Sequence, residues 1–215
     1  MTRIALIHAV AVAIDPVKEA FAELWPDADL VNVFDDSLSV DRARDEALTP
    51  TMRRRIADLG RYALSTGAHG VLYTCSAFGS AIDAFAASAG RPVLKPNEAM
   101  FGRALAAGRR IGMLATFKPS VDSMEEEFRT LAAATGSQAS IETVLVEEAM
   151  VALKEGDADT HNRLLAEAAP RLDGCDAIML AHFSTSRAFA AVSRTSQLPV
   201  LTSPRAAVEE LRARC

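Results

Sequence analysis

Cys75 ends an apolar run, Gly-Val-Leu-Tyr-Thr-Cys at 70–75, and small, turn-forming residues follow it at once at 76–79. This pattern predicts a buried parallel strand that delivers a thiol to its own carboxyl end. The helical pattern at 80–89 would bring backbone N–H groups and a positive dipole end near the sulfur, so we expect a lowered thiol pKa. A free cysteine on an apolar strand is more often core packing, but ligands of open parallel sheets bind beyond the carboxyl ends of strands, which favours chemistry here.

A second copy of this pattern places a histidine where the first copy has the cysteine. Three segment pairs share one offset (182 − 75 = 107 residues): 3–8 with 110–115, 70–75 with 177–182, and 92–94 with 199–201. Identities are few, but three expected strands in one register make chance the weaker explanation, and a duplicated α/β unit is predicted. Cys75 and His182 would then end equivalent strands of two pseudo-symmetric lobes and flank the cleft between them.

The elements around these residues divide the chain into two α/β lobes, each a parallel sheet flanked by helices. We expect residues 1–97 with 205–215 to form the first lobe, which carries Cys75, and 98–204 to form the second, which carries His182. Other candidate positions are His8 at the end of the first strand, either a substrate contact or a structural cap, and the segment 116–120. That segment is either an anion pocket at a helix start or simple helix capping by Ser120.

Charged turns and helices allow two interpretations. The pair Asp35-Asp36 is either solvated or a binding group, and the sequence does not decide between these. The cluster Arg53-Arg54-Arg55 is best explained as a solvated helix face paired with nearby acids, although one arginine could reach a substrate carboxylate.

Composition limits the class of protein. The 215 residues are 50% hydrophobic and 24% charged, as in ordinary globular proteins. The net charge of −5 gives no electrostatic footprint for nucleic acid. No apolar run has the length of a membrane span and no signal peptide is expected. Three cysteines without metal-type spacing indicate a reducing compartment, no disulfide framework and no metal site. We therefore expect a cytoplasmic protein, with a homo-oligomer left open.

Three motifs resemble the aspartate/glutamate racemase superfamily. They are Thr-Cys-Ser-Ala at 74–77, Pro-Val-Leu at 92–94 followed by Asn-Glu-Ala at 97–99, and Arg-Ile-Gly-Met-Leu-Ala-Thr at 110–116. The resemblance spans essentially the whole chain. It implies two similar α/β lobes around one cleft and no pyridoxal phosphate or other cofactor. The superfamily includes amino-acid, hydantoin and allantoin racemases, arylmalonate decarboxylases and maleate isomerases.

The resemblance also implies roles for individual residues. Cys75 matches the first catalytic cysteine. The second site of typical racemases reads Gly-Cys-Thr-His, whereas this chain reads Ala-His-Phe-Ser at 181–184, so His182 replaces the second cysteine. Ser76 and Ala77 stand where Asn and Thr usually bind the substrate carboxylate, and these changes argue against glutamate and aspartate as substrates. The expected substrate-binding residues are His8, Ser76, Ala77, Asn97, Thr116, Phe117, Lys118, Ser120, Phe183 and Ser184.

Inversion of a stereocentre next to a carboxylate requires a base on one face and an acid on the other, and a thiolate opposite an imidazolium meets that need. The sequence therefore predicts a cofactor-independent racemase or isomerase of a small carboxylic acid or amino-acid derivative. A decarboxylating lyase passes through the same enediolate. That activity, a covalent Cys–His catalyst, and a non-catalytic carboxylate-binding protein remain alternatives.

Overall fold

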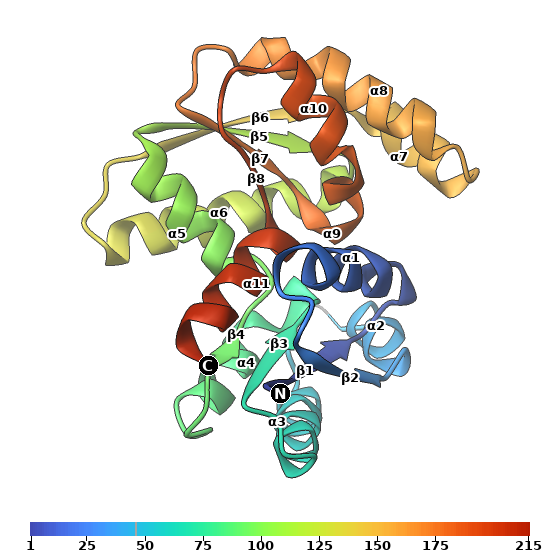
Figure 1. Cartoon of the computed structure of the whole chain (residues 1–215), viewed down its shortest axis with the longest axis vertical. Helices are drawn as coiled ribbons and strands as arrows, with labels where there is room; N and C mark the ends of the chain where they lie inside the picture. The colour runs from blue at the N-terminus through green and yellow to red at the C-terminus, as the bar shows by residue number, and fades with distance from the viewer. Residues whose placement is uncertain (46) are drawn as a thin grey trace. The chain divides into compact units, whose positions relative to one another are not determined.

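The computed structural model describes residues 1–45 and 47–215 (Figure 1). The chain folds into two compact units: unit 1 comprises Met1–Ala99 and Ala207–Cys215, and unit 2 comprises Met100–Ala206. Each unit contains one four-stranded sheet in which every strand pair is parallel. The predicted fold class, two α/β lobes with helix-flanked parallel sheets, is thereby confirmed.

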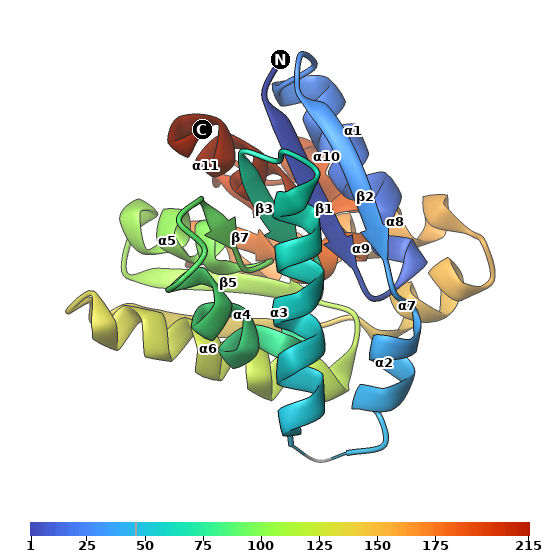
Figure 2. The ribbon, with the colours of Figure 1, turned by 90° about the horizontal axis from the view of Figure 1, so that it is seen from below.

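Unit 1 has the strand order β2-β1-β3-β4, and helix α3 lies across its sheet (Figure 2). Its elements are β1 (Arg3–His8), η1 (Ala11–Ala13), α1 (Ile14–Leu24), β2 (Asp29–Phe34), α2 (Ser37–Arg42), α3 (Pro50–Ser65), β3 (Gly70–Tyr73), η2 (Ser76–Phe78), α4 (Gly79–Ala86), β4 (Val93–Leu94) and most of α11 (Ser203–Arg214).

Unit 2 repeats this plan with the order β6-β5-β7-β8, with α8 and α10 on one side of the sheet and α5 and α6 on the other (Figure 1). Its elements are α5 (Glu98–Ala107), β5 (Arg110–Ala115), η3 (Lys118–Ser120), α6 (Val121–Ala134), β6 (Ser140–Leu145), α7 (Glu147–Lys154), α8 (Ala158–Ala168), η4 (Ala169–Leu172), β7 (Ala177–Leu180), α9 (His182–Thr185), η5 (Ser186–Ala188), α10 (Phe189–Thr195) and β8 (Val200–Thr202).

The central strands are apolar on both faces because helices cover both sides of each sheet. All four residues of β3 and all four of β7 are buried. Each of these strands pairs with a neighbour on both sides, so their carboxyl ends are held in register with the ends of β1 and β5. The third strand of each unit is therefore a rigid base for the residues that follow it.

Helix α3 packs closely on β3 at Gly60. A Cβ at this position would lie 2.5 Å from the Tyr73 hydroxyl oxygen and 2.3 Å from a ring carbon of Phe85, distances that only glycine permits. The Tyr73 hydroxyl donates a hydrogen bond to the Ile56 carbonyl at 2.7 Å. This contact ties the end of β3, two residues before Cys75, to the covering helix.

Across the described residues, no helix is both long enough and apolar enough to cross a membrane.

Candidate functional site

Cys75 lies just beyond the end of β3. The strand ends at Tyr73, two residues earlier than the sequence pattern predicted, and Cys75 has extended backbone (φ −119°, ψ 121°) before the short helix η2. Its side chain is partly buried. The backbone N–H of Ala77 bonds to the sulfur, and the Arg42 guanidinium acts on it electrostatically. The thiol therefore sits at a strand end with one N–H donor and one cation acting on it.

The pKa of Cys75 differs from the sequence-based expectation. Burial raises it above the ordinary thiol value, and the Ala77 N–H and Arg42 offset this only in part. The expectation of a lowered thiol pKa is wrong because the desolvation of the sulfur outweighs these favourable contacts with the thiolate. At neutral pH Cys75 is a thiol, which is a proton donor.

Arg42 was not recognised from the sequence. It ends α2, and its Nε donates to the Ala77 carbonyl at 3.4 Å while another guanidinium nitrogen donates to the Asp45 carbonyl at 2.5 Å. No local pattern pairs residue 42 with residue 77, since the contact exists only after α2 and η2 have folded onto the same unit. A basic residue at the end of a short helix after the second strand was the only available signal.

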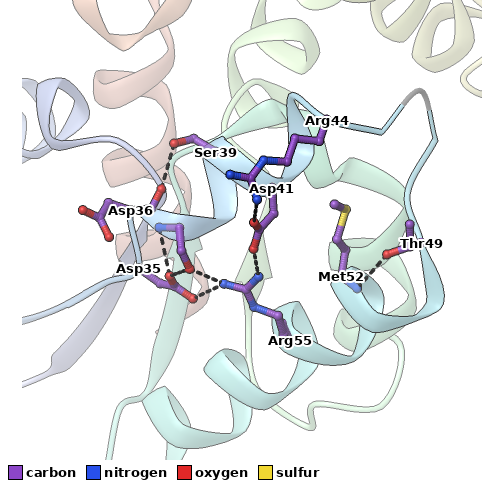
Figure 3. A network of polar contacts seen from close by, with 9 residues as sticks. Asp35, Asp36, Ser39, Asp41, Arg44, Thr49, Met52 and Arg55 are labelled. Atoms are coloured by element: carbon purple, nitrogen blue, oxygen red, sulfur yellow. Dashed lines mark hydrogen bonds and ion pairs between the residues drawn. The ribbon is translucent and has the colours of Figure 1, made fainter.

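A polar network holds α2 in place (Figure 3). Arg55 on α3 donates to Asp35 at 2.8 Å and to Asp41 at 2.6 Å, and it also donates to the Ser37 hydroxyl at 2.6 Å. Partial burial opposes ionisation of Asp35, but its bonds from Ser37 and Arg55 hold its pKa below the usual value. Pairing with nearby acids, the favoured explanation of the arginine cluster, thus describes Arg55, whereas Arg53 donates to the Ser80 hydroxyl at 3.1 Å.

His8 is fully buried at the end of β1. Its Nδ1 lies 3.0 Å from the Thr74 hydroxyl oxygen, and its Nε2 lies 3.0 Å from Asn32 Oδ1. Burial lowers the pKa of His8, and the bond to Asn32 only partly offsets this. A neutral ring that donates from Nε2 to Asn32 leaves Nδ1 as the acceptor beside Thr74, whose hydroxyl oxygen also lies 3.3 Å from the Ile7 carbonyl oxygen. His8 therefore braces the strand end next to Cys75 through Thr74.

His182 starts the equivalent turn in unit 2, directly after β7 and Ala181. Its φ of +70° makes it the only non-glycine residue with positive φ among residues 1–45 and 47–215. This conformation brings Cβ close to the carbonyl oxygen and costs roughly 1–2 kcal/mol. Such strain persists only where the surrounding structure imposes it, and it concentrates at functional sites.

Ser120 fixes the orientation of the His182 ring. Its hydroxyl donates to the Phe117 carbonyl at 2.8 Å, and its oxygen lies 2.7 Å from His182 Nε2. Because the only hydroxyl proton of Ser120 is used toward Phe117, Nε2 carries the proton and donates to Ser120. Nδ1 of His182 is then the basic nitrogen, and in the described part of the chain this buried atom has no hydrogen-bond partner.

The His182 ring is neutral at physiological pH. Burial lowers its pKa, and the Ala181 backbone offsets this in part. A neutral imidazole with one buried, unpartnered basic nitrogen is suited to accept a proton. The protonation state is thus the opposite of the imidazolium that the sequence-based mechanism assumed.

The other predicted residues lie in different surroundings. In unit 1, Ser76 and Ala77 are exposed on η2 directly after Cys75, and Asn97 is buried just before α5. In unit 2, the hydroxyl oxygen of buried Thr116 lies 3.5 Å from that of buried Thr185. Of the remaining predicted residues of unit 2, Phe117 and Lys118 follow β5 and are exposed. Phe183 and Ser184 belong to α9, where Phe183 is buried and Ser184 is half-buried. Among the described residues, no three His, Cys, Asp or Glu side chains form a group that could hold a metal ion.

Solved structures share this fold. An aspartate racemase homologue from Pyrococcus horikoshii OT3 superposes with a TM-score of 0.73 at 13% identity, over 99% of this chain and 98% of that one. For the allantoin racemase from Klebsiella pneumoniae these values are 0.72, 17%, 99% and 87%. For an arylmalonate decarboxylase they are 0.66, 18%, 99% and 92%. Identities this low establish the shared fold and no more.

Sequence comparison identifies the family. A search of curated protein sequences found no significant match. The model of the Asp/Glu/hydantoin racemase family, in contrast, matches residues 10–211, nearly the whole chain. This match agrees with the two parallel sheets and with the resemblance of the three sequence motifs. The chain therefore belongs to the Asp/Glu/hydantoin racemase family.

Proposed function

We propose that this protein is a cofactor-independent racemase or isomerase that moves a proton at the carbon next to a carboxylate, with Cys75 and His182 as the acid and base on opposite faces of one substrate. Family membership supports the reaction class. Each of the two residues follows the third strand of its unit, β3 or β7, and each such strand pairs with the first strand of its unit.

The observation that carries this proposal is the backbone of His182. A histidine with φ of +70° directly after β7 is strained, and a glycine at that position would avoid the strain. The contact of Nε2 with Ser120 orients the ring, but packing does not explain why Nδ1 is buried without a partner in the described structure. A catalytic base that meets its proton only when substrate is bound accounts for both features.

The protonation states define the direction of the first step. Neutral His182 removes the α-proton through Nδ1 and becomes an imidazolium. The Cys75 thiol then delivers a proton to the opposite face and becomes a thiolate, so one C–H bond breaks and another forms. The reverse reaction requires the thiolate–imidazolium state, which the two residues reach after one turnover. The backbone N–H groups of η2, next to Cys75, would bind the substrate carboxylate and its enediolate, and Thr116 directly after β5 is a further candidate donor from unit 2.

Deuterium exchange tests the proposal directly. Amino acids, hydantoins, allantoin and substituted malonates are incubated in D₂O, and α-deuterium and optical rotation are followed by NMR and polarimetry. We expect one class of substrate to exchange and racemise. His182→Ala and Cys75→Ala should each abolish racemisation, and each should lose α-proton exchange only at the substrate face that the replaced residue serves. The control is Cys175→Ala, at a buried cysteine before β7, which should retain racemisation and exchange at both faces.

Equal loss of exchange at both faces in His182→Ala would contradict the two-base assignment. Retention of racemisation by either alanine variant would refute the proposed role of that residue.

One observation favours decarboxylation as a second candidate function. Burial keeps Cys75 protonated, and a thiol that starts as an acid suits the protonation of an enediolate left by loss of CO₂. Such a reaction uses only one proton donor. Release of CO₂ from an arylmalonate, lost in Cys75→Ala and retained in His182→Ala, would establish this function in place of racemisation.

A further inference from the structure

A groove on unit 2 lies apart from the residues discussed so far. It has a volume of about 360 Å³ and is formed by α8, η5 and α10. These segments lie together on one side of the second sheet (Figure 1). Its polar lining consists of Asp159, Asn162, Arg163, Arg187, Arg194 and Thr195. The volume is at the lower end of the range for small-molecule sites, about 300–1,000 Å³.

The charge of the groove is opposite to that of the chain. Three arginines and one aspartate line it, whereas the whole chain has a net charge of −5. Arg163 forms an ion pair with Glu167 at 2.8 Å. For Arg187 and Arg194, no ion pair is formed with any of the described residues. Two guanidinium groups that form no ion pair with a described carboxylate thus line the same small volume, together with Asp159.

The neutral side chains limit what the groove can offer. Oδ1 of Asn162 lies 2.9 Å from His161 Nδ1, which leaves the amide N–H₂ as its donor toward a ligand. The single hydroxyl proton of Thr195 is shared between the Val192 carbonyl at 3.0 Å and the Ala166 carbonyl at 3.2 Å, so only the oxygen lone pairs are left for a ligand. Asp159 provides an acceptor. The groove therefore presents guanidinium and amide donors together with a smaller acceptor region.

We propose that this groove binds a small phosphate monoester that also carries a hydroxyl or ammonium group. Guanidinium forks match the oxygens of a phosphate, which has three acceptor oxygens and a charge near −1.5 to −2 at pH 7. A phosphate alone does not fill 360 Å³. A hydroxyl or ammonium on the rest of the molecule would donate to Asp159, which otherwise repels the anion. The site is independent of the proposed catalytic residues.

Calorimetric titration of the full chain with inorganic phosphate and with glycerol 1-phosphate tests this inference. We expect glycerol 1-phosphate to bind more tightly than inorganic phosphate. Arg187→Gln and Arg194→Gln should each weaken binding about tenfold, the equivalent of about 1.4 kcal/mol. Arg171→Gln, at an exposed arginine of the same unit outside the groove, is the matched control and should change affinity less than twofold. Circular dichroism of each variant verifies folding.

Asp159→Asn tests whether Asp159 recognises the hydroxyl-bearing part of the ligand and not its phosphate. Loss of the carboxylate should strengthen the binding of inorganic phosphate and reduce the preference for glycerol 1-phosphate. No measurable binding of either compound at 10 mM would overturn the proposal. It would also be overturned if Arg171→Gln weakened binding as much as Arg187→Gln, because the effect would then reflect net charge.

Discussion

At the scale of single residues, residue type and position along the chain predict Cys75 and His182 as candidate catalytic residues. Their protonation states, in contrast, follow from tertiary structure. The sequence pattern placed both at strand ends, where the structure has them. Burial then sets the thiol protonated and the imidazole neutral. The contact between Ser120 and His182 joins residues that are 62 positions apart, and the positive φ of His182 depends on how β7 passes into α9. No local pattern encodes either feature.

The strain at His182 predicts an inverted order of stability among its variants. Alanine keeps a Cβ at φ +70°, whereas glycine adopts this conformation without that cost. We expect His182→Gly to have a free energy of unfolding about 1 kcal/mol higher than His182→Ala, measured by urea denaturation. Ala133→Gly in α6 is the control, where glycine should instead be destabilising by about 1 kcal/mol. A less stable glycine variant at position 182 would show that the strain is absent.

In the proposed reaction Ser120 would act through His182, as a positioning residue. Ser120→Ala removes the acceptor for the Nε2 proton and frees the ring to change tautomer. We expect kcat for α-proton exchange to fall about tenfold with little change in KM, and Ser120→Thr to restore most of the activity. The pH profile of kcat should shift in the alanine variant. An unchanged profile together with a raised KM would instead assign Ser120 to substrate binding.

At the scale of elements, the regular parts of the fold were predictable and the short irregular ones were not. The duplicated strands were found because buried parallel strands are continuous apolar runs. The start of α3 likewise has a local cause, since Pro50 is its first residue and the Thr49 side chain accepts from the Met52 N–H. Helix α2 and the 3-10 turn η2 depend on long-range contacts, such as those of Arg55 with Asp35 and Asp41. These short segments bring Arg42 to Cys75, so the electrostatics of the thiol were the part that the sequence did not predict.

The Arg55 network predicts that a distant substitution changes the reactivity of Cys75. Arg55→Gln removes the ion pairs that hold α2, so Arg42 should lose its fixed position. The thiol pKa should rise further, and iodoacetamide labelling of Cys75 at pH 8 should slow several-fold. Arg61→Gln, which removes an exposed pair with Asp58, is the matched control. Equal labelling rates in both variants would mean that α2 does not depend on Arg55.

At the scale of the whole molecule, three of the four histidines are buried or largely buried, and burial lowers the pKa of each: His8, His161 and His182. In the unfolded chain a histidine titrates near pH 6.5. Below that pH the unfolded state therefore binds more protons than the native state, and the free energy of unfolding falls as the pH decreases. Each histidine contributes at most about 1.4 kcal/mol per pH unit to this slope. Both units share this acid sensitivity because each buries at least one neutral imidazole beside its sheet.

His161 offers the clearest test of this pH dependence, since it is fully buried in α8, has no place in the proposed reaction, and has an unpartnered Nε2 in the described structure. His161→Gln removes the titrating group and keeps an amide that can reach Asn162. We expect the unfolding free energy to depend less steeply on pH between pH 6.5 and 5, by at most about 1.4 kcal/mol per pH unit, which corresponds to one proton. Urea denaturation at several pH values measures this slope. His69→Gln, at the exposed fourth histidine, is the matched control. If the two variants change the slope equally, or if His161→Gln leaves it as steep as in the unaltered chain, His161 is not the source of the acid sensitivity.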